Sequence, residues 1–213
     1  MDRLSEVSED MRRYAEDDFG LTWLMSHFHA DWTLVAETAI SAVRYHLWEG
    51  LDPHHVMSLR RDASLLLEGL PSDSIEHLWQ SGTESGHFFG RHVPSGSQWM
   101  EMLIEECDAW LVRRGTIPSR LDPYDQEAGA GEADSILREL NEAAGAIGAE
   151  LANQLAQCLH RCTPNLSFRI LLRVLSCKGE PISRSQYERF TRIGEALHYG
   201  EFVVSNVEYL ATQ

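Results

Sequence analysis

The amino-acid sequence predicts an all-α fold, a helical bundle-like structure with two helical subdomains. Hydrophobic residues recur at three- and four-residue intervals in nearly every apolar segment, which is the period of a helix rather than of a strand. A stretch rich in proline and glycine interrupts this pattern near the middle of the 213 residues, and the helical period restarts beyond it. The predicted organisation is a polar N-terminal segment at 1–19, a helical domain at 20–114, a linker at 115–131 and a C-terminal helical domain at 132–213.

The first helices of the N-terminal domain follow from apolar spacing and stop signals. Leu21, Leu24, Met25, Phe28 and Trp32 follow i, i+3, i+4, i+7 and i+11, which places them on one face of a single helix. A second apolar stripe covers 36–47 and stops at a glycine.

Cap residues predict the remaining helices of this domain. Asp52, followed by a proline, begins a helix that continues to residue 70. Asp73 and Glu76 resemble a capping box for a short helix. After a loop at 81–97, Ser97 caps a helix that carries Trp99, Leu103, Cys107 and Trp110 on its apolar side.

The C-terminal domain shows the same period. One long, alanine-rich helix is expected over 137–162, bent at Gly145 and Gly148. A threonine and a proline break it at 163–164, and a short helix follows around residue 170. Ser183 begins the next helix, and the tail at 202–210 is expected to be helical.

The charge balance excludes some partners and favours others. The chain has 18 basic and 33 acidic residues, a net charge of −15. Residues 1–115 hold 20 acidic and 9 basic side chains, and the rest hold 13 and 9. Such a surface repels phosphate backbones and anionic membranes, so we expect no direct nucleic-acid or membrane partner and favour a basic protein. With no apolar run that could span a bilayer or direct export, the expected compartment is the cytoplasm.

No motif points to catalysis. Residues 82–86 fail the nucleophile-elbow pattern, and no phosphate-binding loop is present. His27 and Asp31, four residues apart, have a spacing that suits a metal, but a polar helix edge is the favoured explanation. Cys158 and Cys162 continue an apolar stripe and are favoured as packed core residues. The sequence therefore predicts no enzyme, no catalytic residue, no metal and no cofactor.

An acidic stripe follows the helix after residue 97. Glu101, Glu105 and Asp108 lie at i, i+4 and i+7, with Glu106 at the edge of the stripe. Such a stripe is either a solvated outer face or a contact surface for the arginines and lysines of a basic partner. These four residues are the predicted partner-binding site.

One short motif resembles a known family. Residues 26–32 are similar to the Y-F-H-Q-D-W signature of a family of bacterial contact-dependent growth inhibition immunity proteins, and the order of the later helices also fits over roughly 20–114. His27 stands where the family has an aromatic residue and Ala30 where it has glutamine. The resemblance implies structural roles for the motif, with Asp31 capping a new helix. The residues that carry it are Phe28, His29, Asp31 and Trp32, with Trp99 in a later Ser-x-x-Trp-like region.

The resemblance implies an immunity protein of the cytoplasm. It would bind a cognate, basic toxin domain delivered by a neighbouring cell and neutralise it by stoichiometric occlusion, without turnover. A helical adaptor or regulator that binds another protein is the alternative. A metal-dependent enzyme that uses the histidine-rich first half ranks third.

Overall fold

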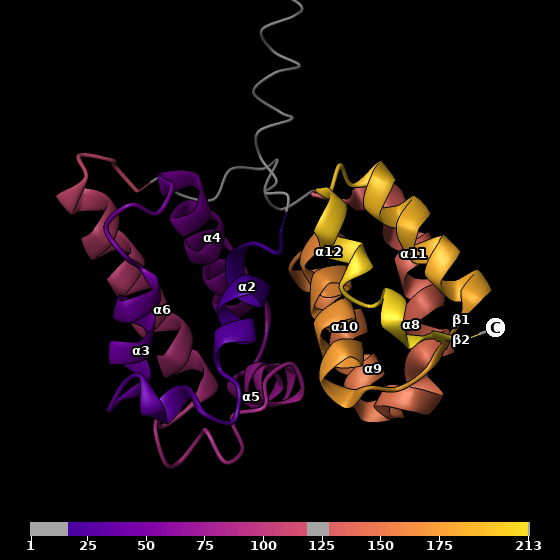
Figure 1. The fold of residues 1–213 in the computed structure, drawn as a ribbon, viewed down its shortest axis with the longest axis horizontal. Coiled ribbons are helices and arrows are strands. Elements are labelled where there is room, and N and C mark those ends of the chain that lie inside the picture. The colour runs from indigo at the N-terminus through magenta and orange to yellow at the C-terminus, as the bar shows by residue number, and fades with distance from the viewer. Residues whose placement is uncertain (1–16, 119–127, 213) are drawn as a thin grey trace, which may run out of the picture.

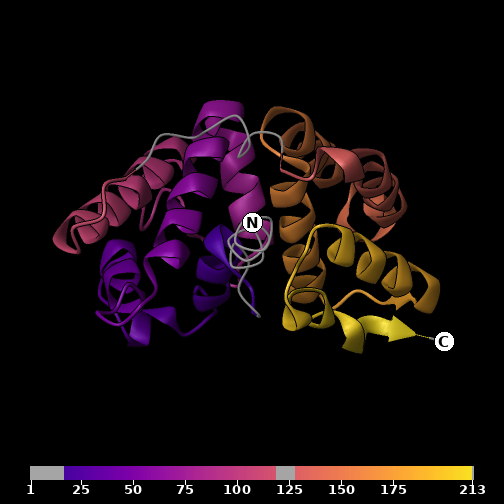
Figure 2. The same ribbon diagram turned by 90° about the horizontal axis from the view of Figure 1, so that it is seen from above.

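The computed structural model describes residues 17–118 and 128–212, and over these residues the predicted all-α class is confirmed. In chain order the elements are α2 (Gly20–His27), η1 (Trp32–Leu34), α3 (Ala39–His46), α4 (Pro53–Gly69), α5 (Ser72–Ser81), α6 (Gly96–Arg113), η2 (Ala130–Glu132), α8 (Ala133–Ile147), α9 (Ala149–Arg161), α10 (Pro164–Lys178), β1 (Ile182–Ser183), α11 (Arg184–Ala196), α12 (Glu201–Ser205), η3 (Glu208–Leu210) and β2 (Ala211–Thr212). The helices form two groups that lie side by side, α2–α6 and α8–α12 (Figure 1). The view from above shows the same division (Figure 2).

Side-chain caps set the starts of α4, α10 and α11 close to the predicted positions. Asp52 accepts a hydrogen bond from the backbone N–H of His54 and begins α4, as predicted. The hydroxyl of Ser183 caps α11 as predicted, and that of Thr163 caps α10 after the predicted break. Each cap satisfies a backbone donor that the first helical turn leaves without a partner.

Two other predicted helix starts are wrong. Helix α6 is capped by Ser95 rather than by Ser97, so it begins two residues earlier. Asp73 and Glu76 form no capping box. The carboxylate of Glu76 instead accepts a hydrogen bond from the backbone N–H of Gly96 at 3.0 Å, which ties α5 to the start of α6.

The second half differs from the prediction at Gly148. The long helix expected over 137–162 is divided there into α8 and α9, and Gly148 has a φ of 97°. Glycine adopts that backbone conformation readily and other residues do so at a cost, so one helix ends and a new one begins at this position.

The tail over 202–210 is mainly helical, as expected, with the short α12 and η3. It then ends in β2, which pairs in parallel with β1.

A buried ion pair joins the two groups of helices. Asp62 of α4 and Arg169 of α10 are each 1% exposed, and Nη2 of the arginine lies 2.7 Å from Oδ2 of the aspartate. The same oxygen accepts from the backbone N–H of Leu21, and Nη1 of Arg169 donates to the carbonyl of Phe19. Burial raises the pKa of Asp62, but the guanidinium groups of Arg169 and Arg61 outweigh burial and lower the net pKa. The pair therefore fixes the start of α2 against both α4 and α10.

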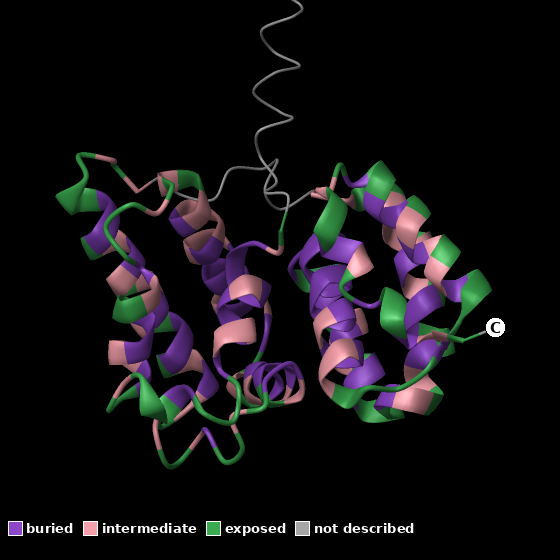
Figure 3. Cartoon of the chain, viewed as in Figure 1, coloured by how far each residue is buried: buried purple, intermediate pink, exposed green. Residues whose placement is uncertain are grey.

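The hydrophobic core continues across the boundary between the groups. Buried apolar residues form one cluster with members in both, and they lie on the inward sides of the helices (Figure 3). Sγ of Cys162 donates to the carbonyl of Leu65 at 3.2 Å, and Nε of Arg173 donates to the carbonyl of Gly82 at 2.9 Å. Packing and polar contacts thus both link the first half of the chain to the second.

The predicted domain organisation rests partly on residues that the structure does not describe. Residues 1–16 of the predicted N-terminal segment and 119–127 of the predicted linker lie outside the described residues. The two groups of helices correspond roughly to the predicted domains at 20–114 and 132–213, but they share one hydrophobic core and a buried ion pair. That each group is a separate domain therefore stays a prediction. Over 17–118 and 128–212, none of the helices has both the length and the apolar character that crossing a membrane requires.

Candidate functional site

Helix α6 separates a buried side from an exposed acidic side, as predicted. Trp99 and Leu103 are 0% exposed and Trp110 is 3% exposed. Glu101 and Glu105, two of the four predicted partner-binding residues, are exposed. Within the described parts of the chain, neither carboxylate has an ion-pair or hydrogen-bond partner. Both negative charges are therefore available to a binding partner.

The other two predicted partner-binding residues already have partners within the chain. Glu106 forms a two-point ion pair with Arg44 of α3, with Nε of the arginine 2.9 Å from Oε2. Asp108 pairs with Arg60 of α4 in the same way. An exposed stripe was expected, but Asp108 is half-buried, as is Glu106 at the edge of the stripe. These two carboxylates hold α6 against α3 and α4, because each neutralises an arginine of a neighbouring helix.

Exposed aromatic side chains lie on and just after α3, the helix that packs along α6. Two contacts place α3 along α6: the Arg44–Glu106 pair and the hydrogen bond from Nε1 of Trp110 to the carbonyl of Leu47 at 2.9 Å. Tyr45 on α3, Trp48 just after it and Val112 near the end of α6 are all exposed. We call the following residues the α3–α6 face: Tyr45 (62% exposed), Trp48 (59%), Val112 (63%), Glu101 and Glu105.

Tyr45 and Trp48 were not among the predicted binding residues. They fall outside the apolar positions that recur at core spacing, and it is those positions that predict the buried face of a helix. Large aromatic residues at off-stripe positions of an amphipathic helix are the signal that could have found them.

The residues that carry the family resemblance divide into buried and exposed members. Phe28, Trp32 and Trp99 are buried and belong to an aromatic cluster with Trp79 and Phe88, whose ring centroids lie 5.2 Å from that of Trp99. The cluster packs mostly edge to face, the favourable arrangement for aromatic rings. These three motif residues are therefore core residues.

The polar members of the motif are exposed. His29 and Asp31 contact each other through a hydrogen bond from the backbone N–H of Asp31 to Nδ1 of His29 at 3.2 Å. The predicted role of Asp31 as a side-chain cap is wrong: it precedes η1, but its carboxylate accepts no capping hydrogen bond. The expected helix over 21–32 also ends early, because α2 stops at His27 and Trp32 lies in η1.

Three histidines gather around Trp23 where α2, α3 and α4 meet. The rings of His27 and His46 stack with centroids 3.9 Å apart, and His55 packs edge-on against Trp23. A helix that continued to residue 31 would place Asp31 next to His27. Because α2 ends at His27, these two side chains are not brought together by helical spacing. In the described residues no three metal-ligating side chains converge on one point.

The histidine cluster predicts a loss of stability in acid. Burial, together with the neighbouring His46 and His29, lowers the pKa of His27 to about 4. The unfolded chain, with an ordinary histidine pKa near 6.5, therefore binds more protons between about pH 6.5 and 4, and stability falls across that window as pH falls. Replacing His27 with glutamine should make the loss of stability between about pH 6.5 and 4 smaller by about 1–2 kcal/mol. The full pKa shift would correspond to a larger value, but the ring is partly exposed and solvent screens its charge.

Urea unfolding at pH 7.0 and pH 4.5 measures this effect. The matched control is His54→Gln on α4, which changes an exposed histidine. Equal acid sensitivity in the wild type and the His27→Gln variant would show that the cluster does not titrate in this window.

The cysteines of α9 are packed core residues, as favoured from the sequence. Cys158 and Cys162 are buried, and the Cys162 thiol is used in the hydrogen bond to Leu65. The contact with Cys162 and burial raise the pKa of the Cys158 thiol. The Cys158 thiol is thus held protonated, and both cysteines serve as packing in the core between α9 and α4.

Comparison of the chain with models of known protein families, with curated proteins and with solved structures gave no match.

Proposed function

We propose that this protein is an immunity protein that binds a basic toxin domain and neutralises it by stoichiometric occlusion. The observation that carries the proposal is the α3–α6 face, where neighbouring elements present exposed aromatic rings and carboxylates that no arginine of the described chain neutralises. The proposal includes the cytoplasm as the site of action and excludes turnover.

The composition of the α3–α6 face suits protein binding. Aromatic side chains supply most of the binding free energy at many protein interfaces, because they bury a large area at a small cost in side-chain entropy. Tyr45 and Trp48 are the anchors of this kind on the face. Surrounding charge of one sign steers a partner of the opposite sign and raises its association rate.

The charge distribution supports a basic partner. The chain carries a net charge of −15, and residues 1–115, which include the face, account for most of it. Many toxin domains of contact-dependent systems act on nucleic acids, and a domain that binds phosphate backbones presents a basic surface.

The placement of the family motif agrees with this role. Its aromatic members form core packing, which leaves the surface free to differ between proteins that bind different toxins. In this proposal Phe28, Trp32 and Trp99 hold the scaffold, and the α3–α6 face provides the contacts.

Charge reversal on α6 tests the proposal. The double variant Glu101→Lys/Glu105→Lys should bind the toxin domain encoded beside this gene about tenfold more slowly at low salt, and the difference should shrink at 0.5 M salt. Stopped-flow or surface-plasmon kinetics measure the rates. The matched control is Glu188→Lys/Glu195→Lys, which makes the same charge change at exposed positions of α11.

The possible outcomes test two claims separately: that the α3–α6 face is the binding site, and that the protein is an immunity protein. An unchanged association rate in the α6 variant, with cells still protected from the toxin, rejects the α3–α6 face. Failure of the wild-type protein to bind or neutralise that toxin domain rejects the immunity function and leaves a helical adaptor as the alternative.

A further inference from the structure

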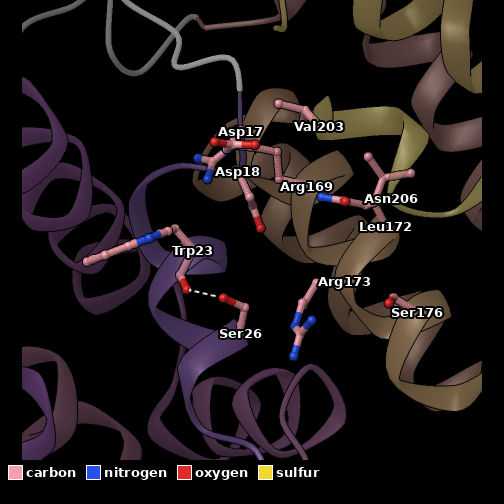
Figure 4. A pocket seen from close by; sticks show the side chains of 10 residues that line it. All are labelled: Asp17, Asp18, Trp23, Ser26, Arg169, Leu172, Arg173, Ser176, Val203 and Asn206. Atoms are coloured by element: carbon pink, nitrogen blue, oxygen red, sulfur yellow. Dashed lines mark hydrogen bonds between the residues drawn. The ribbon is translucent and has the colours of Figure 1, made fainter. Parts of the chain in front are cut away.

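A polar cavity lies between the two groups of helices, away from the α3–α6 face. It has a volume of about 440 Å³ and is lined by α2 on one side and by α10 and α12 on the other (Figure 4). The segment that leads into α2 forms one end of the cavity with Asp17 and Asp18. The volume is sufficient for a small molecule.

One arginine in this cavity, Arg173, has hydrogen-bond donors that no described residue accepts from. Nε of Arg173 donates to the carbonyl of Gly82, which anchors the guanidinium to the end of α5. Its two terminal nitrogens, Nη1 and Nη2, have no hydrogen-bond or ion-pair partner among residues 17–118 and 128–212. Arg169, one helical turn earlier, differs because Asp62 and the carbonyl of Phe19 occupy its nitrogens.

Other polar groups line the same cavity. Figure 4 shows Ser26 on α2, whose hydroxyl donates to the carbonyl of Trp23 at 2.7 Å, and Ser176 and Asn206 on the wall formed by α10 and the segment after α12. The amide of Asn206 has no hydrogen-bond partner in the described residues. A guanidinium with two open nitrogens, in a cavity that also holds an amide donor, is suited to binding an oxyanion.

We propose that this cavity binds a small ligand through an oxyanion group, a carboxylate or a phosphoryl group, held by Nη1 and Nη2 of Arg173. The amide of Asn206 supplies a further donor, and Ser26 closes the cavity on the side of α2. The aspartates at the far end of the cavity keep the anionic group of the ligand at the Arg173 end by repulsion. Such a ligand contacts both groups of helices, so its binding stabilises the folded chain as a whole.

Titration calorimetry at constant ionic strength tests the proposal, with inorganic phosphate in one series and succinate in the other. We expect wild-type protein to bind at least one of them with a Kd of about 1 mM or below. Binding of phosphate alone identifies a phosphoryl ligand, binding of succinate alone identifies a carboxylate, and binding of both supports the shared chemistry. Binding of neither overturns the proposal.

Two variants locate the site. Arg173→Gln should weaken binding about tenfold or more, because it removes the charged fork. Ser26→Met leaves Arg173 and its contact with Gly82 in place but fills the cavity, and should weaken binding to a similar degree. The matched control is Arg138→Gln, the same charge change at an exposed position of α8.

Circular dichroism and the melting temperature without ligand show whether each variant folds. If Arg173→Gln fails to fold, Ser26→Met alone decides. Affinity that is unchanged in every folded cavity variant, or reduced equally in Arg138→Gln, places the anion elsewhere on the protein and overturns the proposal.

Discussion

Replacing Asp62 with alanine is expected to lower the free energy of unfolding by about 3–5 kcal/mol. The substitution leaves Arg169, 1% exposed, as a buried charge without its counter-ion. It also removes the acceptor for the backbone N–H of Leu21, at the start of α2. Urea denaturation at pH 7 measures the change.

A double variant and a surface control complete this experiment. In Asp62→Ala/Arg169→Met neither charge of this pair remains, so we expect it to recover a large part of the lost stability, apart from the contact that Arg61 makes with Asp62. The control is Glu208→Ala, which breaks the exposed ion pair with Arg184 and should cost less than about 1 kcal/mol. If Asp62→Ala and Glu208→Ala lower the free energy of unfolding by the same amount, burial does not determine the strength of the Asp62–Arg169 pair.

Replacing Trp99 with alanine is expected to lower the free energy of unfolding by about 3–5 kcal/mol. Its side chain is 0% exposed, and its ring packs against those of Phe28, Trp79 and Phe88. The substitution opens a cavity that these rigid rings cannot fill. Chemical denaturation measures the loss, and near-ultraviolet circular dichroism reports the disrupted aromatic packing.

The chain offers a control that uses the same substitution. Trp48→Ala changes a tryptophan that is 59% exposed, so it should alter stability by less than about 1 kcal/mol. Under the proposed function it should nevertheless accelerate dissociation from the toxin domain. A stability loss of the same size for the two tryptophans would contradict the packing described for Trp99.

The sequence predicts the helices of this fold better than their ends. Apolar spacing locates the buried positions of α2, α4 and α6 because one helical face must meet the core. The break at Gly148 and the cap at Ser95 depend on backbone conformations that apolar spacing does not report. Boundaries were therefore wrong by a few residues where the element type was right.

The sequence predicts least where distant residues meet. The acidic stripe is visible in the sequence, but the pairing of Glu106 with Arg44 joins residues 62 positions apart. The cavity around Arg173 requires α2 and α10 to be side by side, and no local pattern encodes that arrangement. Such contacts follow from the tertiary packing of elements, so periodicity and spacing do not reveal them.

The buried pair of Asp62 and Arg169 also has a consequence for synthesis on the ribosome. The two residues are 107 positions apart, so the aspartate emerges long before its counter-ion exists. At about 5–20 residues per second, translation leaves this carboxylate without Arg169 for about 5–20 s. During that interval desolvating it is unfavourable, and the nascent first half cannot complete its packing around the start of α2. The first half therefore completes its packing only after α10 has emerged.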